Sequence, residues 1–181
     1  MSTFLKSAVL TASLLLSLSA AQAGGAGMPM PPSVSTAQTT NNPDVLFMDV
    51  ATMSNLAEIA TSKLALQKSS DASVRAFAQQ MITDHTKAQA ELAQLAASKG
   101  IKLADKPGAD QRLQSDKLAT LSGAAFDAMY KMVQVGGHQM TLDLIKTYRT
   151  IGKDVQALAY AAKIQPVVAM HLDMAKALPG Q

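Results

Sequence analysis

The run Ser73–Ser98, SVRAFAQQMITDHTKAQAELAQLAAS, decides the fold of this chain. Projected at 100° per residue, it gathers apolar side chains on one face of a long helix, and His85 lies in the middle of that face. A titratable ring in such a place needs a reason, because burying a polar group without a partner costs free energy. The chain has three histidines, and the pattern predicts that each lies on the inner face of a different helix.

The composition favours helices throughout the chain. Its 181 residues contain no Cys or Trp and only 4% aromatic residues, whereas good helix formers such as Ala, Leu, Met, Gln and Lys abound. This length is enough for one domain with a sizeable core. The formal net charge of +3 comes without a cluster of Lys and Arg, so the sequence predicts no binding to nucleic acid.

The N-terminal residues have the features of an export signal. Lys6 precedes an apolar run, and Ala21-Gln22-Ala23 is a small-residue cleavage pattern. We predict that residues 1–23 are removed and that the protein is exported to the periplasm or the extracellular space; an uncleaved anchor is the alternative. No later run reaches the roughly 18 apolar residues of a membrane span. Residues 24–42 are rich in Pro, Gly, Ser, Thr and Asn, which predicts a disordered linker.

Four long helices are expected between residues 43 and 178, and these residues form the predicted domain. Apolar periodicity places them at about 43–68, 73–99, 122–152 and 153–178. Their ends are marked by residues typical of helix boundaries, namely Pro43, Gly100, Ser122, Gly152 and Pro179. Short links between the first two and the last two helices predict two antiparallel hairpins.

The link between the hairpins is longer, from about residue 100 to residue 122. Its sequence is compatible with a simple loop or with a crossover along the bundle, and a short helix around residues 109–120 fits its composition. In either case the sequence predicts an all-α fold, an antiparallel four-helix bundle.

One polar residue from each helix converges at a similar depth. At about 1.5 Å per residue, Glu58 and His85 lie roughly 18 and 22 Å from the first hairpin turn. His138 and His171 lie roughly 21 and 28 Å from the second turn. The four residues are therefore expected to form one layer near the middle of the bundle.

Imidazoles and a carboxylate on facing helices are a common way for bundles to bind transition metals. We therefore predict that this layer binds one zinc, copper or iron ion, with Asp84 and Asp127 fixing the imidazoles from outside. The alternative is that the histidines donate hydrogen bonds to Asp84, Asp127, Tyr130 or a backbone carbonyl and bind no metal. Imidazole nitrogens within about 5 Å of one another would favour the metal site.

The layer differs from a di-iron centre. Such centres use about four carboxylates and two Glu-x-x-His pairs, whereas Glu58 is followed three residues later by Thr61. Oxygen-activating di-iron chemistry is therefore disfavoured. The methionines of the helical region are interpreted as core residues rather than copper ligands, although Met81 and Met174 lie one turn from a histidine.

Several blocks of the chain resemble a known family. They are Ala57-Glu58, RAFAQQMITDHTKAQAEL (Arg75–Leu92), SGAAFDAMY (Ser122–Tyr130) and HLDMAKAL (His171–Leu178). Together they resemble the bacterial exported family catalogued as domain of unknown function 4142. The resemblance implies a ferritin-like four-helix bundle and export, and no settled activity. Members of that family usually carry a second Asp-His pair on the third helix, where this chain has Gly137-His138.

The leading interpretation is an exported protein of the cell envelope that binds a metal and acts in metal handling or stress response, without being an enzyme. The alternative is a structural or interaction module that binds an envelope protein partner. A redox enzyme with a ferritin-like metal centre is a third and weaker hypothesis, because it would need more carboxylate ligands.

Overall fold

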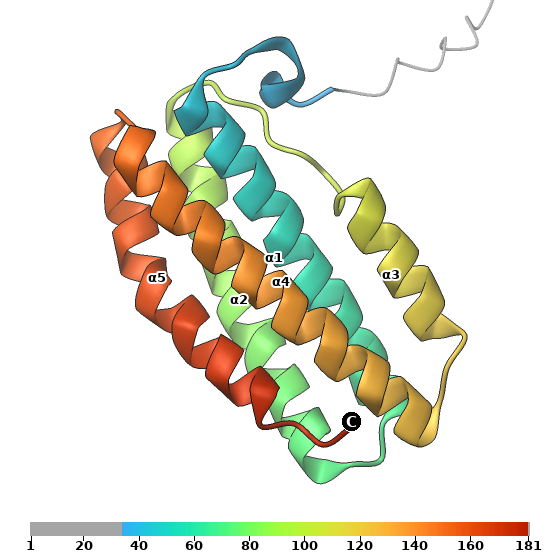
Figure 1. The fold of residues 1–181 in the computed structure, drawn as a ribbon. Coiled ribbons are helices and arrows are strands. Elements are labelled where there is room, and N and C mark those ends of the chain that lie inside the picture. Colours follow the sequence, from blue (N-terminus) through green and yellow to red (C-terminus); the bar gives the residue numbers. More distant parts are fainter. Residues whose placement is uncertain (1–33, 181) are drawn as a thin grey trace, which may run out of the picture. The chain divides into compact units, whose positions relative to one another are not determined.

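The computed structural model describes residues 34–180, and its regular structure is entirely helical (Figure 1). No strand occurs within this range, which confirms the predicted all-α class. The elements in chain order are a short 3-10 helix η1 (Thr36–Thr39) and the α-helices α1 (Pro43–Lys68), α2 (Ala72–Ser98), α3 (Ala109–Ala119), α4 (Gly123–Ile151) and α5 (Val155–Lys176).

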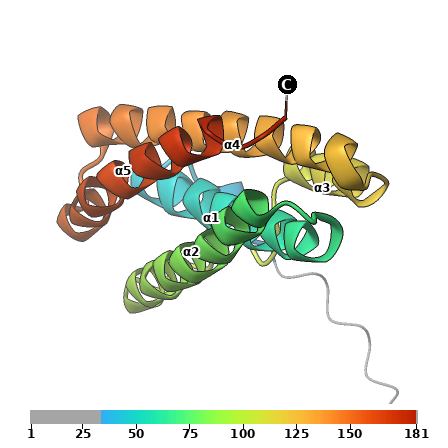
Figure 2. The same ribbon diagram turned by 90° about the horizontal axis from the view of Figure 1, so that it is seen from below.

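The four long helices form two hairpins that pack against each other. Helix α1 pairs with α2 and α4 pairs with α5, while α1 also packs on α4 and α2 on α5. Figure 2 shows α4 and α5 as one layer beside the layer of α1 and α2. Every neighbouring pair runs antiparallel, so the predicted four-helix bundle is confirmed.

The helix boundaries follow from capping residues. Asn42 caps α1, since its Oδ1 accepts a hydrogen bond from the backbone N–H of Asp44 at 2.9 Å. Asp71 and Asp154 cap α2 and α5 in the same way, each accepting from two backbone N–H groups. Ser122 occupies the N-cap position of α4 as expected, although its side chain makes no capping hydrogen bond. Gly100 follows α2 with φ +66°, a conformation that favours glycine.

The link between the hairpins is a crossover along the bundle. It starts beside the beginning of α1, where the backbone N–H of Ala104 donates to Asp49 Oδ1 at 2.7 Å. It ends beside the last residue of α1, where Lys68 Nζ donates to the backbone oxygen of Ala119 at 2.6 Å. Between these points α3 packs on α1 and α4. A single long crossover of this kind is typical of ferritin-like bundles.

The structure differs from the expected linker over residues 35–39. Residues 36–39 form η1, and Ser35 is buried and donates a hydrogen bond to Asp49 Oδ2 at 3.1 Å. The N–H of Thr36 donates to the backbone oxygen of Lys102 at 2.8 Å. Composition could not show these contacts, because they join residues far apart in sequence. The predicted signal peptide and residues 24–33 lie outside the described residues. None of the described helices is long and apolar enough to cross a membrane.

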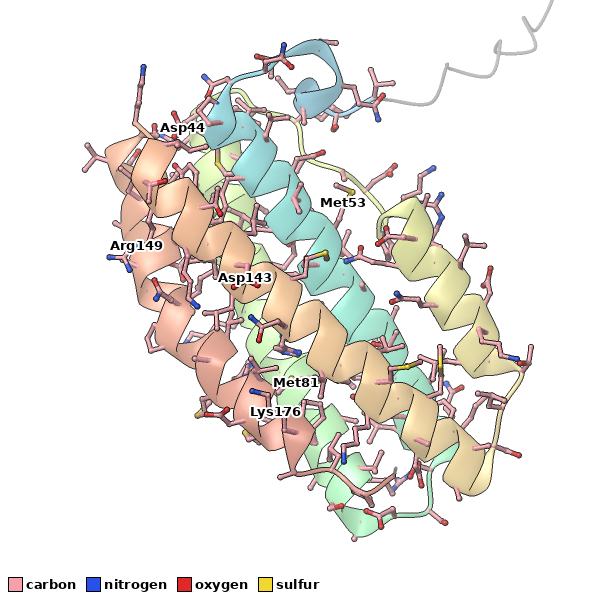
Figure 3. The ribbon with its side chains drawn as sticks, in the orientation of Figure 1. Asp44, Met53, Met81, Asp143, Arg149 and Lys176 are labelled. Carbon is pink, nitrogen blue, oxygen red and sulfur yellow. The ribbon has the colours of Figure 1, made fainter. Side chains whose placement is uncertain are left out.

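Two apolar clusters fill the ends of the bundle. The first apolar cluster includes Phe47, Met48, Leu142, Ile145, Tyr148 and Tyr160, and the rings of Phe47 and Tyr148 stack with centroids 4.0 Å apart. The second apolar cluster lies at the opposite end and includes Val74, Phe77, Met81, Leu118, Phe126 and Tyr130. Figure 3 shows the side chains around the helices, with Met81 fully buried and Arg149 and Lys176 exposed.

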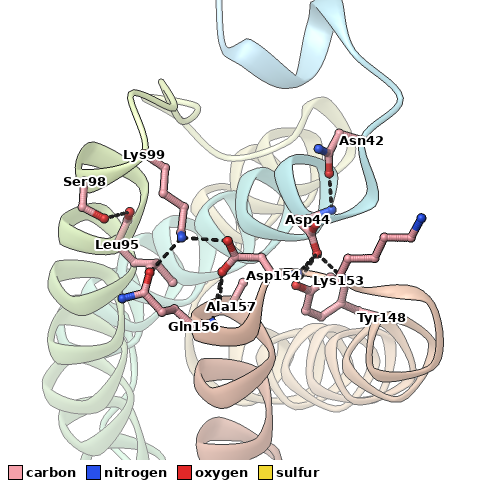
Figure 4. A network of polar contacts seen from close by, with 10 residues as sticks. All are labelled: Asn42, Asp44, Leu95, Ser98, Lys99, Tyr148, Lys153, Asp154, Gln156 and Ala157. Carbon is pink, nitrogen blue, oxygen red and sulfur yellow. Dashed lines mark hydrogen bonds and ion pairs between the residues drawn. The ribbon is translucent and has the colours of Figure 1, made fainter.

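A polar network closes the end that contains the first apolar cluster (Figure 4). Asp44 at the start of α1 accepts hydrogen bonds from Tyr148 Oη at 2.7 Å and from the backbone N–H groups of Lys153 and Asp154 at 2.9 and 3.1 Å. Partial burial raises the pKa of Asp44, but these three donors outweigh it and hold the pKa below its usual value. Asp154 in turn pairs with Lys99 at 2.7 Å. The network joins α1, α2, α4 and α5.

Candidate metal centre

Three histidines, from α2, α4 and α5, meet in the middle of the bundle between the two apolar clusters. His85, His138 and His171 each offer one ring nitrogen, and these three nitrogens lie within 4.8 Å of one another. The ring centroids are 5.5 Å apart in all three pairs. The three residues, called the histidine triad below, are only 7%, 1% and 1% exposed, so their rings are largely withdrawn from bulk water.

Each ring of the triad donates a hydrogen bond from its outer nitrogen to an oxygen of the bundle. The pairs are His85 Nδ1 with Asn55 Oδ1 at 2.9 Å, His138 Nδ1 with the backbone oxygen of Gln134 at 2.8 Å, and His171 Nε2 with Asp84 Oδ2 at 2.9 Å. Carbonyl and carboxylate oxygens only accept, so the hydrogen lies on the histidine nitrogen. The Asn55 amide is oriented by its own Nδ2, which donates to Gln89 Oε1 at 3.2 Å. A neutral imidazole has one N–H, so these contacts fix the tautomer of all three rings.

The inner nitrogens therefore carry lone pairs, and these have no partner. His85 Nε2, His138 Nε2 and His171 Nδ1 are buried without a hydrogen bond to any described residue. Buried polar atoms are normally paired, and lone pairs that face one another are unfavourable as well as unsolvated. Three neutral imidazoles, each oriented through its other nitrogen, are the ligand set of a three-histidine metal site.

The spacing of the triad fits one ion after a small adjustment. Three nitrogens bound at about 2.0–2.1 Å to the same ion lie about 3.5 Å from one another. The observed upper limit of 4.8 Å thus requires a contraction of about 1 Å, which small rotations of the side chains can provide.

Burial favours the neutral form of two of the three imidazoles. Burial lowers the pKa of His85 well below its usual value, and the neighbouring His138 and His171 lower it further. Burial also lowers the pKa of His171, although the hydrogen bond to Asp84 opposes this. Since a metal binds the unprotonated imidazole, neutrality prepares these ligands for an ion.

Glu58 lies beside the triad but does not share its centre. Its Oε1 is 3.7 Å from His138 Nδ1, the nitrogen that faces outward, and its Oε2 is buried with no hydrogen-bond partner among residues 34–180. Burial raises the pKa of Glu58, while His138 and Gln134 oppose the shift. A Cβ atom at Gly137 would lie 2.9 Å from Glu58 Oε1. The absence of a side chain at Gly137 therefore makes room for Glu58.

The two aspartates expected to support the histidines lie in different places. Asp84 accepts the hydrogen bond from His171, and its side chain is 27% exposed. Asp127 lies eleven residues before His138 on α4, about 16 Å along the helix, and makes no hydrogen bond to a histidine of the described chain. Tyr130, named as an alternative partner, pairs instead with Ser62 at 2.8 Å.

Two supporting residues were not expected from the sequence. Asn55 lies three residues before Glu58 on α1, and Gln134 four residues before His138 on α4. Both are buried polar residues at helical spacing from a site residue, and this spacing was the available signal. The side-chain pattern could not indicate that the backbone oxygen of Gln134 accepts the hydrogen bond from His138, because every residue has such an oxygen.

Two cavities flank the layer. The first, of about 350 Å³, lies between α1, α3 and α4 and reaches Glu58 and Gly137. The second, of about 270 Å³, lies among α1, α2, α4 and α5 and reaches His85 and His171. The second cavity is also lined by Asp84, together with Lys87 and Lys163, so it connects the triad with a mouth of mixed charge.

The sequence profile of the family "Domain of unknown function (DUF4142)" matches residues 29–178. The chain belongs to this family. No curated protein matches the sequence at a significant level.

Two solved structures resemble the bundle. "CopM in the Ag-bound form (by soaking)" aligns with a TM-score of 0.60 and 18% identity, covering 74% of this chain and 91% of that chain. "CopM in the Cu(II)-bound form" aligns with a TM-score of 0.59 and 18% identity, covering 74% and 93% of the two chains. At this identity the similarity establishes a common fold.

Proposed function

We propose that this protein binds a transition metal ion through His85, His138 and His171 and serves metal handling in the cell envelope. The observation that carries the proposal is the set of three buried inner nitrogens, each oriented by a hydrogen bond on the other side of its ring and each without a partner in the described chain. Core histidines that serve only as hydrogen-bond donors would not need to point their free lone pairs at one another.

Copper is the favoured ion. Imidazole suits copper, zinc, iron and nickel, and the triad is a buried set of three imidazoles with no carboxylate among its ligand atoms. Asp84 and Glu58 lie near the outer nitrogens of two of these rings. A monovalent ion such as Cu(I) has the smaller desolvation penalty there. The structural similarity to CopM, described in Ag-bound and Cu(II)-bound forms, supports the same class of ion.

Binding, rather than oxygen chemistry, is the proposed role. Di-iron centres of ferritin-like bundles use about four carboxylate ligands, whereas the cluster of nitrogen ligands found within residues 34–180 contains histidines alone. Export rests on the signal-like residues 1–23, and determination of the mature N-terminus tests it separately.

The direct test compares metal binding in the mature, untagged protein and in a triple His→Ala variant of the triad. Competition titrations with Cu(I), Ag(I), Cu(II) and Zn(II) should show a tight site in the wild type whose affinity falls at least a hundredfold in the variant. A matched control replaces an exposed residue one or two positions after each histidine, as Thr86→Ala, Gln139→Ala and Asp173→Ala, and should bind like the wild type. Equal binding by all three proteins would contradict the proposal. A triple variant that loses stability while the wild type binds no metal would support the structural role instead.

A further inference from the structure

The cavity between α1, α3 and α4 leads from the surface to a buried carboxylate. Exposed residues of α3 and α4, such as Gln114 and Met132, form its mouth. Its floor belongs to α1, where Ala57, Glu58 and Thr61 are all buried. Its volume of about 350 Å³ lies at the lower end of the range for ligand pockets. The cavity therefore has the size and the depth of a site for a small molecule.

Helix α3 explains why apolar side chains do not fill this space. The residues that α3 contributes to the lining are all polar, namely Asp110, Gln111 and Gln114. Its one buried residue, Leu118, lies near the other end of the helix. A helix that covers a core normally presents an apolar stripe to it. On the α4 side, a Cβ atom at Gly136 would meet nothing within 4 Å. The polar residues and the missing side chain together leave the cavity open.

Glu58 lines this cavity with a carboxylate that is not fully paired. A Cβ atom on Gly137, which lines the same cavity, would lie 2.9 Å from Glu58 Oε1. Glu58 is only 7% exposed, and its Oε2 is buried with no hydrogen-bond partner in the described chain. His138 Nδ1 lies 3.7 Å from Oε1, but its N–H is donated to the backbone oxygen of Gln134 at 2.8 Å. A hydrogen-bond donor for Oε2 must therefore come from outside these residues.

The missing partner of Glu58 should bring both positive charge and hydrogen-bond donors. A buried carboxylate without a donor costs free energy. The charged lining residues are Glu58 and Asp110, and no Lys or Arg is among them. The second cavity, by contrast, includes Lys87 and Lys163. A negatively charged lining favours a cation, and a primary ammonium group adds three N–H donors to its charge.

The walls of the cavity favour an organic cation over an inorganic ion. Apolar side chains line much of it, among them Ala57, Met129, Val133 and Met140. A hydrated inorganic ion would leave these side chains in contact with water, whereas a hydrocarbon chain would cover them. Methionine side chains are flexible and can adapt to the shape of such a chain. The lining therefore fits an ammonium group that carries a short alkyl chain.

We propose that this cavity binds a small primary alkylamine, with its ammonium group at Glu58 and its alkyl chain between α1 and α4. The inference goes beyond the proposed function and needs no bound metal, because Glu58 lies on the side of the outer nitrogen of His138. The amine supplies the charge and the donor that Glu58 Oε2 lacks in the described chain.

Titration of the metal-free mature protein with n-butylamine tests the proposal. The amine is protonated at pH 7.5, as a lysine side chain is. Calorimetry in the presence of EDTA should show saturable binding that weakens by about tenfold or more in Glu58→Gln, since hydrogen bonds to charged groups are the stronger ones. The matched control is Asp173→Asn, the same change at a side chain that is 81% exposed, and it should bind like the wild type. Equal binding by Glu58→Gln and the wild type would overturn the site.

Three further ligands test the chemical class. n-Butanol lacks the charge and ammonium chloride lacks the alkyl chain, so each should bind more weakly by about tenfold or more. Ammonium that binds as tightly as n-butylamine would overturn the alkyl part of the proposal. Nα-acetyl-lysine amide presents the same ammonium group as a lysine side chain of another protein. Tighter binding of this compound than of n-butylamine would overturn a free amine as the ligand.

NMR of labelled methionine methyl groups locates the bound amine. The signals of Met129 and Met132 should shift on addition of n-butylamine, whereas those of Met53 and Met174, which line neither cavity, should not. Gly136→Leu should abolish the shifts in a folded protein, because leucine is the better helix former and its Cβ meets no atom within 4 Å. Absence of the Met129 and Met132 shifts in the wild type would contradict binding in this cavity.

Discussion

The two apolar clusters differ from the layer between them in how their buried polar atoms are paired. The clusters contain aromatic and aliphatic side chains whose only polar atoms are paired, as for the hydroxyls of Tyr130 and Tyr148. The layer contains the triad, Glu58 and Gln134, and these residues account for five of the seven buried side-chain atoms that lack a partner in the described chain. The ends of the bundle therefore provide its stability, whereas the middle holds groups that burial disfavours.

This contrast indicates which part of the molecule is functional. A fold needs the apolar clusters, but it does not need three lone pairs that face one another, since apolar residues of similar size would fill the layer at lower cost. Unsatisfied polar groups in an otherwise consistent structure are expected at functional sites. Changes in the clusters should therefore affect stability alone, and changes in the layer should affect binding more than stability.

The largest effect is expected in the first apolar cluster. Phe47→Ala removes a 2% exposed ring that stacks on Tyr148 and should lower the free energy of unfolding by about 3–5 kcal/mol, measured by urea denaturation. The number of metal ions bound per folded molecule should not change. Leu113→Ala is the control, because Leu113 is 71% exposed on α3 and should change stability by less than about 0.5 kcal/mol. Loss of metal stoichiometry in folded Phe47→Ala would contradict the separation of the two regions.

The polar network at the bundle end should give the next largest effect. Asp44→Asn keeps the size of the side chain but weakens three hydrogen bonds that join the two hairpins. We expect a loss of about 2 kcal/mol, because hydrogen bonds to charged groups are the stronger ones. The loss should shrink as the pH falls below 3.8, the ordinary pKa at which the unfolded chain takes up the proton, and through the lowered pKa of folded Asp44. A constant difference at all pH values would show that the charge of Asp44 is unimportant.

The smallest effect, and one of opposite sign, is expected in the layer. Burial raises the pKa of Glu58, so the folded state binds more protons than the unfolded state as the pH rises above 4.5, and stability falls until the folded-state pKa is passed. Glu58→Gln removes this loss and should stabilise the metal-free protein at pH 7.5 by about 1 kcal/mol. Thermal unfolding of both proteins at several pH values measures this stabilisation. A destabilised Glu58→Gln protein would indicate that the carboxylate has a partner in solution.

The triad should make the metal-free protein less stable as the pH falls. Burial lowers the pKa of His85 and His171, so below the ordinary value of 6.5 the unfolded chain binds more protons than the folded one. Stability is therefore present above about pH 6.5 and falls as the pH decreases. The Glu58→Gln variant isolates this loss of stability at low pH, because it should lack the loss of stability at higher pH that Glu58 causes. Unchanged stability from pH 7 to 5 in that variant would contradict neutral, buried imidazoles.

The sequence predicts the helices well because their ends depend on local chemistry. Pro43, Gly100 and Gly152 mark boundaries through their own backbone properties. The sequence does not determine the path of the link between the hairpins, because that path depends on contacts such as that of Ala104 with Asp49, which no local pattern encodes. The ordered structure of residues 35–39 depends on similar long-range contacts.

The site was predictable to the level of helix face and depth. The rotation and the rise per residue of a regular α-helix are enough to place the three histidines in one region of the bundle. The direction of a ring nitrogen depends on side-chain torsions and on neighbours such as Asn55, so the tautomers required the structure. The position of Glu58 beside the outer nitrogen of His138, rather than at the centre, follows from its fit against Gly137.

The central claim is that the inner nitrogens of the triad are unprotonated and take up an ion. Long-range ¹H–¹⁵N NMR of the imidazoles tests it directly, because protonated and bare nitrogens have well-separated shifts. In the metal-free protein at pH 7.5 the hydrogen should lie on Nδ1 of His85 and His138 and on Nε2 of His171. Addition of Ag(I) should then shift the three bare nitrogens together at one equivalent per triad. The opposite tautomers, or bare nitrogens that do not move when Ag(I) is added, would contradict the account.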